Sequence, residues 1–499
     1  MDYIICYDVG TSGIKCGLFD ENLSCCAITQ SNYTVTMNAD STAEANPDDY
    51  FAGVAKCTRD MLAKSRVLPE NIRSLCITTQ GETLIPVDQA GAPLMPAVVW
   101  LDGRAEKEAA WIKQRIPDDV FRAKTGLPGI DRYVPLAKLL HIKNEHPDVY
   151  LKTNKFLLLE DYLTYRLTDK QVSEKSLLSS TGYFELPADT IWQEALDLIG
   201  VEREKIPTMI DPGMAIGNLT ATAAGALGLS QNTVVYAGAM DQVAGAVGCG
   251  NYIVGAAHEA TGTAMVAAAT LPLDSCLASD PQLTIYRHVQ PDEFLLLAIS
   301  RTATVVLKWF AEQFYGNNKR EDIYDYLSSV AEKACVGANG MLMLPYYEGL
   351  PGNDDVKGAF LNVGLHNTRE DFVRAVFEGI AYMLNDNIRL MFGNQKVESL
   401  VSIGGASKSE IWCQIKADIT GSTILTIGQQ EAALFGCACI AAVGSGAFAS
   451  LTDAVNTQKN GKVYKPNKVN EQYYENRYSQ YCAIKETVAA LDLRSKKTK

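Results

Sequence analysis

The sequence is poor in histidine and has fewer positive than negative charges, and each shortage excludes a class of function. Its five histidines are spread along the chain, and neither Cys25-Cys26 nor Cys437-x-Cys439 has the spacing of a zinc site. We therefore expect no structural zinc. The formal net charge of −13 over 499 residues argues against a nucleic-acid partner, although local loops and a metal can still attract an anionic nucleotide.

Signals for secretion and for the membrane are also missing. The chain enters an apolar strand at once, without the basic region or the cleavage site of a signal peptide. The 13 cysteines are odd in number and scattered, which is typical of free thiols in a reducing cytoplasm. Residues 432–452 carry no charge, but they are rich in Ala, Gly and Ser. We expect them to form a buried helix ending near Gly444, and we expect no membrane contact.

The two commonest nucleotide-binding motifs are absent. There is no GxxxxGK[ST] loop and no well-placed GxGxxG, so a phosphoryl-transfer enzyme with this sequence would be neither a P-loop enzyme nor a Rossmann dehydrogenase. An apolar content of 47% and a charged content of 21% are globular values, and the length favours two or three domains.

What the sequence does contain begins in residues 3–20, whose pattern predicts a strand, a tight turn and a second strand. The turn carries a carboxylate, two glycines, two hydroxyls and a lysine: Asp8, Gly10, Gly13, Thr11, Ser12 and Lys15. A carboxylate beside a nest of N–H donors suits a nucleotide phosphate with Mg²⁺. An ordinary hairpin with Gly and Asp in its turn has the same pattern, and this stretch alone does not separate the two.

Two later strands also end in polar residues. SLCITT (74–79) runs into Gln80-Gly81-Glu82-Thr83, and AVVW (97–100) runs into Leu101-Asp102-Gly103-Arg104. Because an open α/β sheet keeps its ligand site at the ends of adjacent strands, Glu82, Asp102 and Arg104 are site candidates. The alternative is that Asp102 and Arg104 pair with each other in a structural turn.

The region from 105 to 230 is mostly helical in pattern, and residues 161–167 predict an amphipathic helix with a wet face. Residues 233–250 then predict a buried strand, a turn and a helix of small residues. Asp241 lies at this turn among apolar and small residues, where a carboxylate is costly unless it is paired, capping or catalytic. Helix capping and catalysis are compatible roles for it.

Residues 253–270 repeat the N-terminal theme, with a Thr261-Gly262-Thr263 turn between two apolar strands. Two such hairpins, one at the head of each half, predict a duplicated architecture that holds a nucleotide between the halves, unless the two turns coincide by chance. Further on, a strand runs into GGASKS (404–409), which suits close approach of a nucleotide to a helix N-terminus. The tail over 450–499 is polar and charged, and we expect its RSKKTK end to be frayed.

Taken in order, these segments resemble the FGGY carbohydrate kinase family over about residues 3–446. DVGTSGIK and ATGT are similar to its two phosphate loops, GAMDQVAGAVG to its catalytic loop, GGASKSEIWCQIKADITG to its adenine signature and AVVWLDGRA to its xylulokinases. The resemblance implies an α/β fold of the two-domain, actin-like ATPase type, with ribonuclease H-like duplicated domains and an active site in the interdomain cleft. The domains would be residues 1–245 and 246–499.

The resemblance also implies roles for single residues. Asp241 would be the general base that takes a proton from the substrate hydroxyl, and Asp8 would hold Mg²⁺ through water. The ATP-binding set would be Gly10, Thr11, Ser12, Lys15, Gly262, Thr263, Gly404, Gly405, Ala406 and Ser409. The two turns would line the phosphates, and residues 404–406 would line the adenine.

The likeness to one substrate class is incomplete. Xylulokinases usually carry Met-His-Gly after the residue matching Gln80, whereas Glu82 matches a polyol-binding Glu of glycerol kinases and Gly81 lacks their Arg. We expect Gly81 to leave space for a longer substrate, which favours a D-xylulose-like ketose, with glycerol or another short polyol as the alternative. The substrate-binding set would be Gln80, Glu82, Asp102, Arg104, Tyr133, Asp241 and Gln242.

Two other classes of protein are compatible with parts of this pattern. A non-catalytic regulator that binds ATP and sugar would have the fold, but the retention of Asp8, both turns and Asp241 argues against lost chemistry. A glycoside hydrolase using Asp241 and Glu82 would not need two phosphate turns. The expected partners are therefore a small sugar or polyol and ATP, and a homodimer is compatible with the sequence.

Overall fold

The computed structural model describes residues 2–11, 13–315, 323–349, 355–428 and 431–491. These residues form two compact units, and each unit combines three separate segments of the chain. The first unit consists of Met1–Val254, Thr270–Leu296 and Glu431–Lys459. The second consists of Gly255–Ala269, Leu297–Gln430 and Asn460–Lys499.

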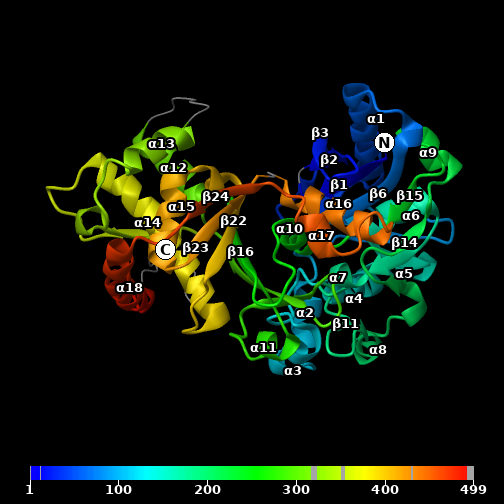
Figure 1. Ribbon diagram of the computed structural model, residues 1–499. Helices are drawn as coiled ribbons and strands as arrows, with labels where there is room; N and C mark the ends of the chain where they lie inside the picture. Colours follow the sequence, from blue (N-terminus) through cyan, green and yellow to red (C-terminus); the bar gives the residue numbers. More distant parts are fainter. Residues whose placement is uncertain (1, 12, 316–322, 350–354, 429–430, 492–499) are drawn as a thin grey trace. The chain divides into compact units, whose positions relative to one another are not determined.

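The first unit is built on a six-stranded sheet with the order β14-β15-β6-β1-β2-β3 (Figure 1). Its strands are β1 (Tyr3–Val9), β2 (Gly13–Phe19), β3 (Cys25–Asn32), β6 (Ile72–Thr79), β14 (Ala215–Asn218) and β15 (Val234–Tyr236). The predicted N-terminal hairpin is confirmed, because β1 and β2 pair antiparallel from Ile4 opposite Phe19 to Val9 opposite Ile14. β6 runs parallel to β1, with Thr79 opposite Val9, so both strands end at the same edge of the sheet.

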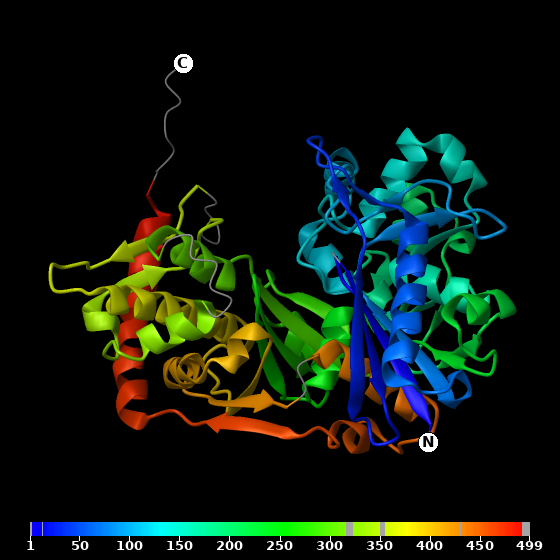
Figure 2. The same ribbon diagram turned by 90° about the horizontal axis from the view of Figure 1, so that it is seen from above.

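Helices from distant parts of the chain cover this sheet. α1 (Pro47–Ser65) is capped by Asn46, whose Oδ1 accepts from the N–H of Asp48. It packs against β2 and β3, as Figure 2 shows in blue. α16 (Ala432–Gly444) packs against β1, β6 and α10 (Asp241–Gly248). The predicted buried helix ending at Gly444 is therefore confirmed, and no helix among the described residues is long and apolar enough to cross a membrane.

The helices α10 and α16 approach each other closely at two glycines. A Cβ atom on Gly248 would lie 1.8 Å from the carbonyl oxygen of Ala432, and one on Gly436 would lie 1.9 Å from the carbonyl oxygen of Ala244. Any side chain at either position would push the helices apart. The small residues in both helices therefore serve the packing of α10, the helix that begins with Asp241.

The rest of the first unit is mainly helical, as its sequence pattern predicts. A five-stranded sheet has the order β4-β5-β8-β7-β9 and consists of β4 (Thr36–Met37), β5 (Ala43–Ala45), β8 (Ala97–Val98), β7 (Leu84–Val87) and β9 (Lys155–Leu158). Two small ladders are β10 (Val172–Glu174) with β13 (Thr208–Ile210), and β11 (Phe184–Glu185) with β12 (Thr190–Ile191). The remaining helices are α2 (Glu106–Lys113), α3 (Asp118–Thr125), α4 (Pro135–Glu145), α5 (Pro147–Lys152), α6 (Leu159–Thr168), α7 (Lys175–Leu178), α8 (Gln193–Ile199), α9 (Ala221–Leu227), α11 (Leu273–Leu277) and α17 (Leu451–Val455).

One helix prediction in this unit is wrong in detail. The helix predicted over 161–167 is present as α6, but its acidic residues are buried rather than wet. Asp161 Oδ2 accepts from the N–H of Leu158 at 2.9 Å, and Glu160 Oε1 accepts from the N–H of Gly238 at 3.2 Å. Both carboxyls therefore satisfy buried backbone donors, a use that polar periodicity does not reveal. All 13 cysteines lie in the described part of the chain, and none of them is in a disulfide there.

The sheet of the second unit repeats the strand pattern of the first. The order is β18-β19-β17-β16-β22-β23-β24, with β18 (Thr284–Arg287), β19 (Phe294–Ser300), β17 (Met265–Leu271), β16 (Ala257–Thr261), β22 (Ser399–Ile403), β23 (Thr423–Ile427) and β24 (Asn460–Tyr464). By their residues, the end of β17, all of β18 and the start of β19 belong to the first unit. β16 pairs antiparallel with β17 and parallel with β22, as β1 does with β2 and β6. The predicted duplication is therefore confirmed.

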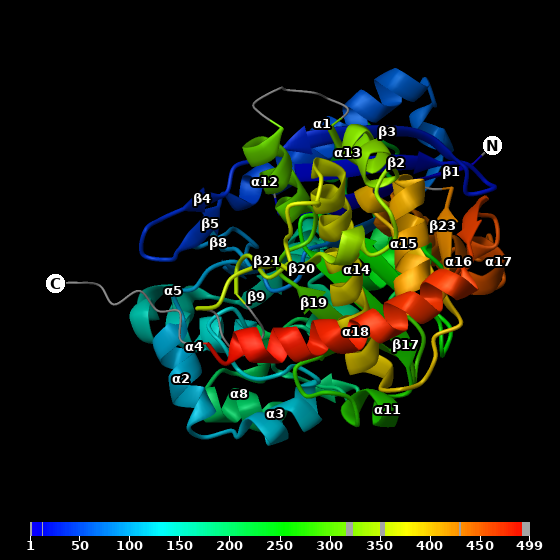
Figure 3. The same ribbon diagram turned by 90° about the vertical axis from the view of Figure 1, so that its left-hand side faces the viewer.

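The second unit also contains a structured tail that the sequence pattern did not predict. Its helices are α12 (Thr304–Phe314), α13 (Ile323–Ala331), α14 (Arg369–Phe392), α15 (Glu410–Thr420) and α18 (Lys468–Ala489), and a short ladder joins β20 (Leu342–Leu344) to β21 (Ala359–Leu361). α18 packs on α15 (Figure 3). It buries Tyr474, Tyr478 and Tyr481. The polar tail therefore supplies core residues, while its last residues, 492–499, lie outside the described part of the chain.

Candidate active site

The first predicted phosphate turn connects β1 to β2. The N–H of Gly10 donates to the carbonyl oxygen of Gly13 at 3.1 Å, which closes the turn. Trp100 Nε1 donates to Thr11 Oγ1 at 2.9 Å, so the turn is attached to the segment that follows β8. Ser12, predicted to belong to the same turn, lies outside the described residues.

Two charged residues flank this turn. Burial raises the pKa of Asp8, at the end of β1, to about 6, while the charge of Lys15 opposes that rise and the charge of Glu431 adds to it. Lys15 Nζ contacts Glu431 Oε2 at 2.7 Å, and both side chains are partly exposed. Asp8 is thus held as a carboxyl that ionises near neutral pH, and Lys15 has a carboxylate partner within the same unit.

Glu82 follows β6 in a strained backbone conformation. Its φ of 57° lies in the left-handed region, which residues other than glycine rarely adopt and which often marks a functional site. Burial raises the pKa of Glu82 to about 7, while Lys138 and a hydrogen bond from Ser180 oppose the rise. A carboxyl in this state is protonated below neutral pH and charged above it.

A fully buried lysine holds the backbone of this region. Lys138 Nζ, from α4, donates to the carbonyl oxygens of Glu82 at 3.1 Å, Val99 at 3.0 Å and Trp100 at 3.3 Å. Burial lowers the pKa of Lys138 to about 8. Lys138 therefore connects the loop after β6 to the segment after β8, the two places where the sequence predicted site residues. Sequence reasoning missed it because a lysine within a helix usually indicates a solvated position.

The residues on either side of Glu82 show how little room this loop has. Gln80 is buried, and its Nε2 donates to Thr83 Oγ1 at 3.1 Å. A Cβ atom on Gly81 would lie 3.0 Å from Ser180 Oγ and 3.2 Å from Met240 Sδ. A side chain at this position would therefore crowd Ser180 and Met240, and the expectation that Gly81 leaves space for a longer substrate stays a prediction.

Asp102 and Arg104 show the pairing that the sequence left open as an alternative. Arg104 Nε donates to Asp102 Oδ1 at 2.7 Å, and Arg104 Nη2 donates to Glu44 Oε1 at 2.6 Å. Asp102 is fully buried, and its Oδ2 also accepts from the N–H of Ala43 at 2.6 Å. Both oxygens of Asp102 are thus engaged by the protein itself, so the pair supports the fold of the loop.

Asp241 is the first residue of α10. The residue before the helix is Met240, so the interpretation of Asp241 as the N-cap is wrong. Asp241 Oδ1 accepts from the N–H of Gln242 at 2.6 Å. Burial raises the pKa of Asp241 to about 7, and the charges of Asp8 and Glu82 add to the rise. The structure thus brings three predicted acidic site residues into electrostatic contact, and Gln242 lies beside them.

Tyrosines from two further segments belong to this neighbourhood. Tyr133 is exposed and its N–H donates to Asp131 Oδ1 at 2.8 Å, while the charge of Asp131 raises the pKa of Glu82. Tyr286, on β18, is buried, and the charges of Glu82 and Asp241 help to raise its pKa. Sequence reasoning missed Tyr286 because it lies in an apolar strand with no accompanying motif.

In the second unit, four of the six predicted nucleotide-binding residues line one cavity, whereas Thr263 and Gly404 are not in its lining. Its volume is about 380 Å³. The lining includes Gly262 from the second turn and Gly405, Ala406 and Ser409 from the loop before α15. The other lining residues are Thr261, Thr304, Leu307, Tyr324, Asp325, Ser328, Phe377, Lys408 and Trp412. The structure thus brings together two segments that lie far apart in the sequence and that were predicted to bind one ligand.

The local backbone explains this arrangement. Gly404 has a φ of 81°, and a Cβ atom there would lie 3.4 Å from the carbonyl oxygen of Thr261, so glycine lets β22 turn beside the second turn. Ser409 caps α15, because its Oγ accepts from the N–H of Trp412. The N–H of Ala303 donates to the carbonyl oxygen of Thr263 at 2.9 Å, which fixes the second turn to the start of α12.

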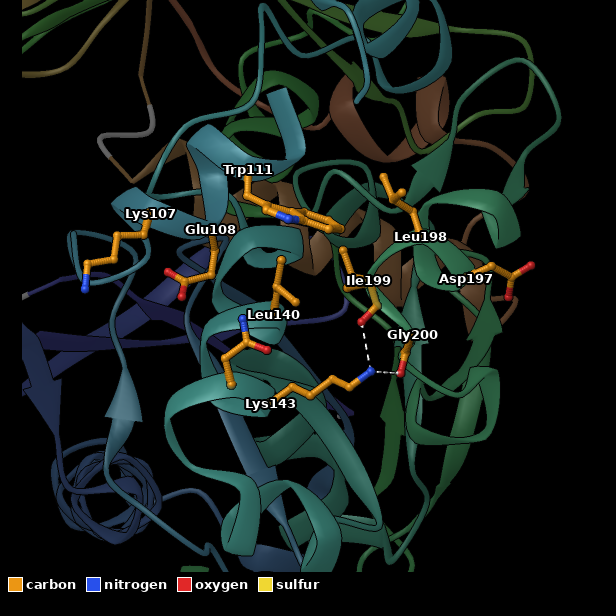
Figure 4. Close-up of a pocket in the computed structure, with 10 residues that line it drawn as sticks. Lys107, Glu108, Trp111, Leu140, Lys143, Asp197, Leu198, Ile199 and Gly200 are labelled. Carbon is orange, nitrogen blue, oxygen red and sulfur yellow. Dashed lines mark hydrogen bonds between the residues drawn. The ribbon is translucent and has the colours of Figure 1, made fainter. Parts of the chain in front are cut away.

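A further cavity in the first unit contains none of the predicted site residues. It has a volume of about 470 Å³ and lies between α2, α4 and the end of α8 (Figure 4). Lys143 reaches the carbonyl oxygens of Ile199 and Gly200 there, the former at 3.0 Å. Its charge thus satisfies the C-terminus of α8, which is a structural use of the side chain.

Comparison with known proteins decides the family. Residues 3–248 match the N-terminal domain, and residues 260–445 the C-terminal domain, of the FGGY family of carbohydrate kinases. The chain belongs to the FGGY family of carbohydrate kinases. It is therefore a carbohydrate kinase, and family membership implies ATP as the phosphoryl donor.

Relatives of this FGGY kinase act on more than one sugar. It is 29% identical to the xylulose kinase of Staphylococcus epidermidis over 97% of its own length and 96% of the relative. It is 27% identical to the gluconokinase of Bacillus licheniformis over 88% of its length and 86% of the relative. The structure of ligand-bound xylulose kinase from Lactobacillus acidophilus superposes with a TM-score of 0.89 at 25% identity, covering 98% of this chain and 99% of that one.

Proposed function

We propose that this FGGY kinase transfers the γ-phosphate of ATP to a hydroxyl of a small ketose, with D-xylulose as the first candidate. The observation that carries the proposal is the group formed by Asp8, Glu82 and Asp241, three carboxyls whose pKa values burial raises to between about 6 and about 7. Carboxyl groups poised near neutral pH are typical of acid–base chemistry. The similarity to xylulose kinases, which extends over nearly the whole length of this chain, supports the choice of sugar.

In this proposal Asp241 is the general base. Its carboxylate takes the proton from the sugar hydroxyl as the hydroxyl oxygen attacks the γ-phosphorus and the bond to the β-phosphate oxygen breaks. The hydrogen bond from the N–H of Gln242 holds the carboxylate oxygen at a defined position. Because the base acts only when ionised, the pKa of about 7 places the rise of activity across neutral pH.

Asp8 is the proposed magnesium residue, and the donor chemistry fits this role. Mg²⁺ is usually bound by one or two carboxylates together with waters and phosphate oxygens. Burial raises the pKa of Asp8 more than the charge of Lys15 lowers it, so a cation bound there would favour the ionised carboxylate. A bound Mg²⁺ would neutralise phosphate charge during transfer. The proposed phosphate contacts are Gly10, Thr11, Ser12, Lys15, Gly262 and Thr263, and the proposed adenine contacts are Gly404, Gly405, Ala406 and Ser409.

The sugar would be held by the first unit. Gln80, Glu82, Tyr133 and Gln242 remain the proposed contacts, whereas Asp102 and Arg104 are proposed to act by supporting the loop, because they bind each other. Gluconate is the second candidate substrate, since relatives of comparable identity are gluconokinases. Glycerol or another short polyol remains the alternative that Glu82 favours from the sequence.

The proposal is tested by measuring ADP formation with Mg-ATP against D-xylulose, L-xylulose, D-ribulose, gluconate and glycerol, with a sample lacking sugar. We expect D-xylulose to give the highest kcat/KM. A preference for gluconate or glycerol would show that D-xylulose is not the main substrate, but it would not contradict the kinase assignment. ADP formation that does not depend on any sugar would contradict the kinase assignment and favour a regulator that binds ATP.

Two further proposals concern the location of the enzyme in the cell and its oligomeric state. We propose a cytoplasmic location, which the 13 cysteines, none of them in a disulfide in the described part of the chain, support. A homodimer is the proposed oligomeric state, and sedimentation velocity would show either the mass of one chain or that of two.

A further inference from the structure

A fully buried ion pair contacts residues that line the cavity of the second unit. Lys416 Nζ, on α15, contacts Glu259 Oε1, on β16, at 2.7 Å, and neither side chain has any solvent exposure. Removing two charges from water costs more than an ion pair usually returns, so such a pair is weak evidence for a gain in stability. The pair is better explained by the arrangement that it imposes on the segments around it.

Glu259 connects three segments that carry the proposed nucleotide contacts. Its carboxylate accepts from Ser402 Oγ, on the strand that enters the 404–406 loop, and from Thr261 Oγ1, at the start of the second phosphate turn. The third donor is Lys416 itself, on the helix that Ser409 caps. A single buried carboxylate thus joins the loop, the turn and the helix.

Lys416 makes the same connection from the other side. Its Nζ donates to Thr261 Oγ1 at 3.0 Å and lies 5.3 Å from the ring centroid of Trp412, within the range of a cation–π contact. Trp412 and Phe377 contact each other with ring centroids 4.5 Å apart, and both line the cavity. Lys416 therefore couples the phosphate turn to the aromatic wall of the cavity.

We propose that Glu259 and Lys416 are positioning residues for the nucleotide, which set the second phosphate turn and the wall formed by Trp412 as one rigid frame. The inference rests on the proposed function, because it takes the cavity of the second unit to be the ATP site. Neither side chain touches the cavity. The pair acts through Thr261, whose hydroxyl is engaged by both partners and is therefore not available to a ligand.

The test compares two buried ion pairs of the same unit. Replacing both partners avoids an unpaired buried charge, so the main variant is Glu259→Gln with Lys416→Met. The matched control is Glu378→Gln with Arg374→Met, a buried pair on α14 whose contact is 2.8 Å and which does not line the cavity. ADP affinity is measured by calorimetry without sugar, and the KM for sugar is measured separately.

We expect the Glu259/Lys416 variant to bind ADP at least tenfold more weakly, with the KM for sugar within twofold of wild type. The control variant is expected to bind ADP within twofold of wild type, whatever its loss of thermal stability. ADP affinity equal in the main variant and the wild type would overturn the proposal. Failure of the wild-type protein to bind ADP would instead contradict the proposed function.

A second variant covers the case in which the double variant does not fold. Thr261→Val keeps the shape of the side chain and leaves the ion pair in place, but it removes the hydroxyl that links the pair to the turn. We expect ADP to bind at least threefold more weakly to this variant, and circular dichroism is expected to show an unchanged fold. Wild-type ADP affinity in Thr261→Val would mean that the pair does not act through this hydroxyl, and would contradict the proposal.

Discussion

Asp241 is the proposed general base, and its replacement is the most direct test at the scale of a residue. Asp241→Asn keeps the shape and removes the base, so kcat is expected to fall by about 10²- to 10⁴-fold. The KM for ATP is expected to stay within a few-fold, because the nucleotide contacts are proposed for other residues. Steady-state kinetics with the best sugar measures both. An unchanged kcat would contradict the role of Asp241.

The raised pKa values also make a prediction about stability. Burial raises the pKa of Asp241 to about 7 in the folded state, above the ordinary value of 3.8, so the fold favours its protonated form. Its ionisation therefore costs stability, and this cost grows as the pH rises from about 4 to about 7. Asp241→Asn is expected to raise Tm at pH 8 and to change it little at pH 4.

The control for this measurement is Asp60→Asn, which changes an exposed carboxylate on α1. Its Tm is expected to follow that of the wild type at both pH values. A loss of Tm at pH 8 in Asp241→Asn would show that the ionised carboxylate stabilises the fold, opposite to the sign argued from burial.

Lys138 gives a second prediction at this scale. Lys138→Met would leave the carbonyl oxygens of Glu82 and Trp100 without this donor, whereas that of Val99 would still accept from the N–H of Asp102. Each buried group left unsatisfied costs about 1–3 kcal/mol. We expect a lower free energy of unfolding and a higher KM for sugar. Lys143→Met is the control, because Lys143 also binds backbone carbonyls but lies outside the proposed site. An unchanged KM for sugar in Lys138→Met would show that the lysine only supports the fold.

Single site residues could be predicted only where a side chain differs in polarity from its neighbours in the sequence. Asp241 stands out as a carboxylate among small and apolar residues, and Glu82 follows a buried strand. Lys138 and Trp100 act through contacts that join segments separated in sequence, which no local pattern contains. For Asp102, the sequence was compatible both with substrate binding and with a structural pair with Arg104. Only the contacts of Asp102 with Arg104 and Ala43 favour the structural pair.

At the scale of an element, the close contact between α10 and α16 positions the helix that begins with Asp241. Gly436→Ala would place a methyl group 1.9 Å from the carbonyl oxygen of Ala244. Overpacking of this kind costs about 1–3 kcal/mol, and movement of α10 would displace the proposed base. We expect both Tm and kcat to fall, as measured by thermal unfolding and steady-state kinetics.

Gly225→Ala on α9 is the matched control, since a Cβ atom there would have no neighbour within 4 Å. Alanine at this position is expected to leave kcat unchanged and to stabilise the fold by about 0.5–1 kcal/mol, because it restricts the unfolded chain. Equal behaviour of the two variants would mean that the glycines of α10 and α16 do not set the helix contact.

The elements themselves were predictable where caps and turns are local. The start of α1 and the end of α16 follow from Asn46 and Gly444, which lie at the element ends. α18 was missed because its composition is polar, although Tyr474, Tyr478 and Tyr481 recur at helical spacing and form its buried face. The buried acids of α6 could not be foreseen, because their partners are backbone groups brought close only by the fold.

At the scale of the whole molecule, the duplicated strand pattern places a glycine-containing turn between β1 and β2 in one unit and between β16 and β17 in the other. The chain as a whole carries a net charge of −13, which opposes the binding of an anionic nucleotide. We therefore expect a strict requirement for a divalent cation. Chelation by EDTA is expected to abolish sugar phosphorylation and to weaken ADP binding in calorimetry, with both restored by excess Mg²⁺. Full activity in EDTA would contradict the proposed role of Asp8.

The central claim is that this FGGY kinase moves a phosphoryl group from ATP to a sugar with Asp241 as the base. The most direct measurement is phosphorus NMR of the products formed from Mg-ATP and D-xylulose by the wild type and by Asp241→Asn. The account predicts one sugar phosphate ester for each ADP in the wild type, and almost none in the variant although it still binds ADP. Inorganic phosphate in place of the ester, or equal ester formation by both proteins, would contradict it.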